Sequence, residues 1–132
     1  MQRLSATLAV VALALPAVSS AVTPQRLRAL IYRTQPCLAH IVDVEGGRWQ
    51  ATESYGGSYG KTEESYGLPQ ADPGTKMAYW PYTVGHEHAG TPTPGDWATN
   101  PWTQLAWARN YAIGRYGSVC AAWQYRDANG YW

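Results

Sequence analysis

Phenylalanine is absent from this chain of 132 residues, and charged residues are scarce at 14%. Lysine and arginine number 10 against 9 for aspartate and glutamate, so the formal net charge is only +1. A polyanionic partner requires a clear basic excess, and we therefore expect no nucleic-acid partner. The length has room for one domain, because two would each be too small to bury a useful core.

The aromatic residues that are present are 7 tryptophans and 10 tyrosines. This content excludes a disordered chain, because disordered segments are poor in aromatic residues. Tryptophan and tyrosine both combine a flat apolar face with a hydrogen-bonding group. The composition therefore favours a polar ligand with flat faces, such as a sugar, over a purely hydrophobic one.

The first 21 residues have the order of features that is typical of a secretory signal peptide. Met1–Arg3 carries a positive charge, Leu4–Val18 is mostly apolar, and Ser19–Ala21 offers the small residues that signal peptidase reads. The apolar stretch is short for a membrane span, and no later stretch is suited to crossing a bilayer. We therefore expect a secreted, extracellular or periplasmic protein, with a mature domain over residues 22–132. The alternative is an uncleaved anchor or a buried N-terminal helix.

Cys37 and Cys120 are the only cysteines of the sequence. In an exported chain such a pair indicates one disulfide, which would join the front of the domain to its end. Closing so long a loop contributes about 4 kcal/mol of stability in the chain-entropy model. Two buried free thiols are the alternative.

Capping signals and apolar spacing predict four helices separated by a short β or loop region. The segment between Gln50 and Ala78 is rich in glycine and tyrosine, and it permits only short strands and turns. The fold class is therefore α+β and predominantly helical. The predicted helix starts are Thr23-Pro24, Gln35-Pro36, Asn100-Pro101 and about Ser118, and the predicted ends are at Gly46-Gly47, Gly117 and Asn129-Gly130.

Glu45 stands on the core-facing stripe of the second predicted helix, three residues after Val42 and four after Ile41. A carboxylate at such a place costs free energy unless it is paired, neutral or functional. Burial and the negative end of a helix dipole raise the pKa of a carboxyl group, as a general acid near neutral pH requires. In glycosidases such an acid protonates the leaving oxygen. The alternative is a side chain that turns outward at a frayed helix end.

Six segments of the chain carry recognisable motifs in a fixed order, and together they resemble the lytic transglycosylase branch of the lysozyme-like superfamily. The chain ends in Asn129-Gly130-Tyr131-Trp132, which is similar to the usual ending of that family. The resemblance implies a single lysozyme-like domain. The segments are Cys37–Glu45 with Trp49, Tyr66–Ala71, Pro73–Met77, Asp96–Leu105, Arg115–Gly117 and Cys120–Trp123.

The resemblance implies an enzyme that cleaves peptidoglycan glycan strands between N-acetylmuramic acid and N-acetylglucosamine. The essential glutamate of the family corresponds to Glu45. It would protonate the glycosidic oxygen and then act as base toward the muramic acid 6-hydroxyl, which gives a 1,6-anhydro product. Tyr66 and Gln70 correspond to residues across the cleft from this glutamate. The resemblance also supports pairing of the two cysteines, and we expect a monomer without a cofactor.

Further aromatic residues are candidates for the substrate cleft. Trp49 follows the helix of Glu45 closely, and we expect it to shield this carboxylate or to line the cleft. Trp123 and Tyr125 are further candidates for substrate contacts, whereas helical spacing assigns Trp102 and Trp107 to the core. The Tyr79–Gly95 segment is longer than the link expected in similar sequences, so it is a candidate for reshaping the cleft.

Two other functions stay open. A hydrolytic muramidase needs a second carboxylate, and Glu53, Glu63, Glu64 and Asp72 follow Glu45 in the sequence. We expect these to be solvated loop residues, which favours the anhydro-forming reaction. A non-catalytic module that stacks aromatic residues on wall sugars is the other alternative, and it leaves Glu45 without a role.

The remaining charged and metal-ligating side chains predict neither a metal site nor a second reaction. His86 and His88 alternate on a loop, but a metal site needs three or four ligands, so we predict none. Asp43 is expected at the surface, facing away from the glutamate two residues later. Arg48 and Lys76 are candidates to meet carboxylates of the peptide stem, although lone cations are usually solvated.

Overall fold

The computed structural model describes residues 21–55, 65–83 and 85–132. The expected signal peptide, except Ala21, the glycine-rich stretch after Tyr55, and the carboxylates Glu63 and Glu64 lie outside the described residues. No helix of the described part is long and apolar enough to span a bilayer.

The described part is mostly helical, as the sequence predicts. The helices are α1 (Pro24–Thr34), α2 (Pro36–Glu45), α3 (Pro101–Tyr116) and α4 (Val119–Asn129), with a short 3-10 helix, η2 (Gly74–Ala78). A small antiparallel pair is formed by β1 (Ser54–Tyr55) and β2 (Ser65–Tyr66), in which Ser54 pairs with Tyr66.

The helices begin and end where the capping residues predict. The side chains of Thr23, Asn100 and Ser118 accept hydrogen bonds from backbone N–H groups of the first turns of α1, α3 and α4. Gly117 and Gly130 follow α3 and α4 in the left-handed conformation, which glycine adopts without strain.

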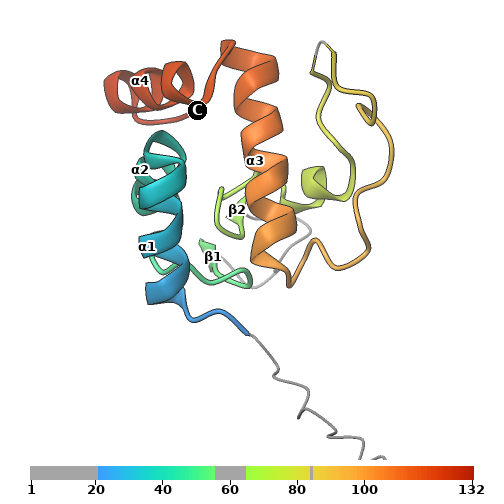
Figure 1. Cartoon of the computed structure of the whole chain (residues 1–132). Helices are drawn as coiled ribbons and strands as arrows, with labels where there is room; N and C mark the ends of the chain where they lie inside the picture. Colours follow the sequence, from blue (N-terminus) through green and yellow to red (C-terminus); the bar gives the residue numbers. More distant parts are fainter. Residues whose placement is uncertain (1–20, 56–64, 84) are drawn as a thin grey trace, which may run out of the picture.

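Helix α3 is the central element of the fold. Figure 1 shows it between the α1–α2 pair on one side and the Tyr79–Gly95 loop on the other. α4 packs on both α2 and α3. The main core joins residues of three helices and of the segment after β2, among them Leu27, Leu38, Leu68, Met77, Leu105 and Trp107.

The two tryptophans near the start of α3 have different surroundings. Trp107 is buried at 4% exposure, as predicted, but the assignment of Trp102 to the core is wrong, because its side chain is 45% exposed. The buried face of α3 centres on Gln104, Leu105 and Ala108. At 100° per residue, Trp102 lies about 160° around the helix from Gln104, the fully buried residue of this face.

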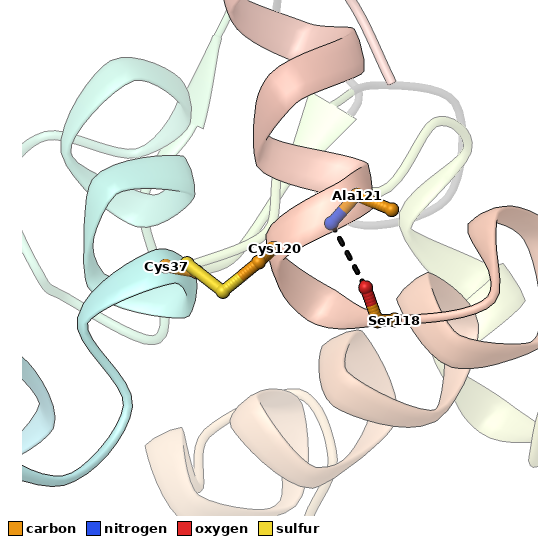
Figure 2. Close-up of a disulfide and its surroundings, with 4 residues drawn as sticks. All are labelled: Cys37, Ser118, Cys120 and Ala121. Atoms are coloured by element: carbon orange, nitrogen blue, oxygen red, sulfur yellow. Dashed lines mark hydrogen bonds between the residues drawn. A yellow bond between two sulfur atoms is a disulfide. The ribbon is translucent and has the colours of Figure 1, made fainter.

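The predicted disulfide is present. Figure 2 shows that Cys37, near the start of α2, is joined to Cys120, near the start of α4. The bridge spans a sequence separation of 83 residues. Restricting the unfolded chain over such a loop contributes about 4 kcal/mol in the chain-entropy model. The disulfide therefore fixes α4 against α2.

Gln104 is a polar side chain in the centre of the fold, with 0% exposure. Its Oε1 accepts from the N–H of Leu68 (2.9 Å), and its Nε2 donates to the carbonyl groups of Ala51 (2.8 Å) and Trp97 (3.0 Å). The amide thus joins three loops to α3. Such a fully buried group is tolerated because it is well hydrogen-bonded.

We predict that Gln104→Leu lowers the free energy of unfolding by about 3 kcal/mol, because one buried and two partly buried backbone groups lose their partner. Urea denaturation measures the change. Gln124→Leu, at an exposed position of α4, is the matched control and changes stability by less than about 0.5 kcal/mol. Equal stability of the two variants would contradict the role assigned to the amide.

Candidate functional site

A cavity of about 260 Å³ lies where the end of α2, the segment from β2 to η2, the middle of α3 and the C-terminal residues meet. Glu45 enters it from the last position of α2, and Gln70 and Asp72 enter from the turn before η2. The structure thus brings the predicted acid and one predicted substrate contact into the same cavity. The other lining residues with a charged or aromatic side chain are Lys76, Trp107, Tyr111, Tyr131 and Trp132.

Glu45 forms an ion pair with Arg126 of α4. The Arg126 Nε donates to Glu45 Oε1 (2.5 Å), and its Nη2 donates to the carbonyl oxygen of Val44 (3.3 Å). The Glu45 and Arg126 side chains are only 17% and 19% exposed. Glu45 is therefore oriented by a cation, and pairing is one of the conditions under which a carboxylate is tolerated on an apolar stripe.

A signal for the Arg126 contact was present in the sequence. Glu45 lies eight residues after Cys37, and Arg126 lies six residues after Cys120. The predicted bridge holds the two helices together, and Arg126 is the one cationic residue of the helix that carries Cys120.

Gln70 is held in the turn between β2 and η2. Tyr66 and Ala71 pair across this turn through two backbone hydrogen bonds. The Gln70 Nε2 donates to the carbonyl groups of Gly67 (2.9 Å) and Glu53 (3.3 Å). Gln70 has a φ of +50°, which is uncommon for a residue with a side chain. These hydrogen bonds fix its amide at the cavity wall.

Tyr66 and Trp49 are buried, and neither is among the residues that line the Glu45 cavity. The Tyr66 hydroxyl donates to the carbonyl oxygen of Ala98 (2.7 Å), so it joins the turn to the loop before α3. The Trp49 indole N–H donates to Asp43 (2.7 Å). Trp49 lines a second hollow of about 520 Å³, together with the exposed Trp102.

Trp123 and Tyr125 also lie outside the lining of the Glu45 cavity. The Trp123 ring stacks on His40 of α2, with ring centroids 5.0 Å apart. The Tyr125 hydroxyl is 3.0 Å from that of Tyr131, which lines the cavity. Tyr125 therefore supports a lining residue, whereas Trp123 joins α4 to α2.

Four aromatic residues that the sequence did not assign to the site line its wall, namely Trp107, Tyr111, Tyr131 and Trp132. Trp107 and Tyr111, neighbours on α3, stack with centroids 5.1 Å apart, and Trp132 meets the Tyr111 ring edge-on at 5.2 Å. The Trp107 indole N–H donates to the carbonyl of Tyr79 (2.9 Å), which joins the long loop to this wall. Trp107 lies in the core, as helical spacing predicts, and it borders the cavity as well.

Asp43 is an ion-pair centre and not the solvated surface residue that we expected. Its carboxylate accepts two hydrogen bonds from Arg28 of α1 (2.9 and 2.8 Å), one from Trp49 (2.7 Å) and one from the Tyr32 hydroxyl. These donors, Arg28 above all, lower the pKa of Asp43 from 3.8 to about 2. Asp43 thus holds α1, α2 and Trp49 together.

The histidines of the long loop contact each other and α3. His86 lies against the His88 ring, and its Nε2 is 2.9 Å from the Asn110 side-chain nitrogen. Throughout residues 21–55, 65–83 and 85–132, no group of three His, Cys, Asp or Glu side chains is placed to hold a metal ion.

Comparison of the chain with models of known protein families, with curated proteins and with solved structures finds no match. A function is therefore inferred from the side chains of the cavity and their chemistry.

We predict that Asp43→Asn lowers the free energy of unfolding at pH 7 by about 2 kcal/mol. A depressed pKa stabilises the folded chain above pH 3.8, and this contribution is lost as the pH falls through about 2. The difference between wild type and variant therefore narrows over that range. Urea titrations at several pH values measure it, with Asp127→Asn, at an exposed position of α4, as control. A difference that is independent of pH would contradict the assignment.

Proposed function

We propose that this chain is a peptidoglycan lytic transglycosylase that cleaves the bond between N-acetylmuramic acid and N-acetylglucosamine, with Glu45 as the acid and base. The observation that carries the proposal is the presence of Glu45 and Gln70 in one cavity with aromatic walls. The motif resemblance predicts both residues for this site from separate segments of the sequence.

The position of Glu45 suits proton transfer to a bound sugar. Its carboxyl group lies at the end of a helix, is largely shielded from water and borders the cavity. Protonation of the glycosidic oxygen lets the C1–O bond break and releases N-acetylglucosamine as an alcohol. The resulting Glu45 carboxylate then takes the proton of the muramic acid 6-hydroxyl. At the same time the oxygen of this hydroxyl bonds to C1, and Glu45 returns to its acid form.

The wall of the cavity suits a glycan with acidic substituents. The rings of Tyr111, Tyr131 and Trp132, which are only partly buried or exposed, offer apolar surface for pyranose rings. Because the Gln70 Nε2 donates to Gly67 and Glu53, its Oε1 is the atom that offers a hydrogen bond, as an acceptor for N–H or hydroxyl groups of the sugar. The ammonium group of Lys76 lines the same cavity and suits a carboxylate of the peptide stem.

We predict that Glu45→Gln keeps binding to purified peptidoglycan and lowers the release of soluble muropeptides by at least about 100-fold, the contribution typical of a general acid. Co-sedimentation with insoluble wall measures binding, and chromatography of the supernatant measures release. Glu87→Gln is the matched control, because the Glu87 side chain is 84% exposed on the long loop. Unchanged release from Glu45→Gln would remove the proposed role. Binding without release by the wild type would indicate a wall-binding module instead.

A hydrolytic muramidase is the second candidate, and one observation favours it. Asp72 lines the same cavity as Glu45, so a second carboxylate is present beside the proposed acid. In that reaction the second carboxylate activates water or traps the sugar cation. Glu53, another residue that the sequence offered for this role, is not among the residues that line the cavity.

We predict 1,6-anhydro ends from both wild type and Asp72→Asn, with release rates within about 3-fold of each other, because an internal hydroxyl needs no activated water. Mass spectrometry separates the products, since anhydro ends lack one water relative to reducing ends. Reducing ends from the wild type, together with loss of release in Asp72→Asn, would support the muramidase.

A further inference from the structure

Glu53 is a half-buried carboxyl group between the two parts of the proposed site, and the chemistry above does not use it. Its Oε2 accepts a hydrogen bond from the backbone N–H of Arg48 (3.3 Å). Its Oε1 is shielded from solvent and has no hydrogen-bond partner within the described part of the chain. A buried acceptor without a donor is unfavourable, so this oxygen requires an explanation.

Gly46, the residue after Glu45, provides the space that Oε1 occupies. A Cβ atom at Gly46 would lie 2.1 Å from Glu53 Oε1 and 3.0 Å from the carbonyl oxygen of Leu68. The two oxygens therefore border the same small space against the end of α2. If both are unprotonated, two acceptors face this space, whereas a proton on Oε1 supplies the missing donor.

The backbone of Glu53 holds the opposite part of the site. Its carbonyl oxygen accepts from the N–H of Gly67 (2.8 Å) and from Nε2 of Gln70 (3.3 Å). One residue thus contacts the end of the helix that carries Glu45 through its side chain, and the turn that carries Gln70 through its main chain.

We propose that Glu53 is a positioning residue that acts in its neutral form. The O–H of its carboxyl group donates to the carbonyl oxygen of Leu68 and holds the Gly67–Gln70 turn in register with the end of α2. The experiments that measure lytic activity rest on the proposed function, whereas the structural role of Glu53 does not depend on it.

The electrostatic surroundings favour the neutral acid up to about pH 7. Burial raises the pKa of Glu53 from 4.5 to about 7, while N–H groups of Arg48 and Gln50 and the Arg48 charge act in the opposite direction. The charged residues on the adjoining elements are Arg48, after α2, and Glu45, at its end. The Gly67–Gln70 turn itself carries no charged side chain. As the pH rises through about 7, the proton that holds the turn is lost.

Glu53→Gln tests the inference, because its amide retains a donor for Leu68 and an acceptor for Arg48 at every pH. We expect the wild-type lytic rate to fall above pH 7 by about 10-fold per pH unit, as the neutral fraction does. In Glu53→Gln we expect this fall in rate to begin at a pH that is higher by at least about one unit. Glu53→Ala has no donor and is slow at all pH values, whereas Glu87→Gln keeps the wild-type profile. An alkaline limb that is identical in wild type and Glu53→Gln overturns the inference.

Two readouts do not depend on catalysis. The carboxyl carbon resonance of Glu53, followed by NMR in the inactive Glu45→Gln variant, titrates with a midpoint near 7 and moves the amide resonances of Gly67 and Leu68 with it. A raised folded-state pKa also makes the wild type lose stability, relative to Glu53→Gln, as the pH rises from 4.5 through about 7. A midpoint near 4.5 overturns the inference even where lysis is observed. A midpoint near 7 in a chain without lytic activity refutes only the proposed function.

Discussion

The buried amide of Gln104 is the constraint on which the candidate site depends most. It lies on α3 and holds the Leu68 N–H, at the centre of the turn that presents Gln70. The same amide binds Ala51 and Trp97, so the segments before β1 and before α3 are fixed to one point. Because these backbone groups are buried or partly buried, losing the amide would leave polar groups without a partner beside the core. The position of the cavity wall is therefore set by hydrogen bonds to a residue of the core.

Close backbone approach at two glycines completes this constraint. A Cβ atom at Gly67 would lie 2.5 Å from the Gln104 oxygen, and the φ of Gly67 is +75°. Gly46 leaves the corresponding space for Glu53. The turn thus packs against α3 on one side and against the end of α2 on the other. A side chain at either glycine would clash there and move the turn away from the helix.

Local signals predicted the helices, because caps and spacing are properties of short segments. The disulfide was predicted from the two cysteines of a sequence with an expected signal peptide, and the placement of Glu45 and Gln70 in one cavity was predicted from the motif resemblance. Contacts between segments were harder to predict. The Arg28–Asp43 pair and the Glu45–Arg126 pair join residues 15 and 81 positions apart, and periodicity gives the face of a helix but not its partner. Tyr66 and Trp49 were expected near the substrate, yet their polar atoms bind Ala98 and Asp43, since an aromatic side chain with a polar group serves a core as readily as a cleft.

Three carboxyl groups within eleven residues illustrate how the fold assigns different chemistry to one functional group. Asp43 is surrounded by donors and remains ionised, Glu45 pairs with one arginine at the cavity, and Glu53 is half-buried, which raises its pKa to about 7. The chemistry of the three carboxyl groups differs because each one faces a different segment of the chain. For Glu45 that segment is α4, and the Cys37–Cys120 bridge ties α4 to the helix that carries the acid. Oxidation of the two cysteines therefore supports the placement of Arg126, so the covalent link that stabilises the fold also orients the proposed catalytic group.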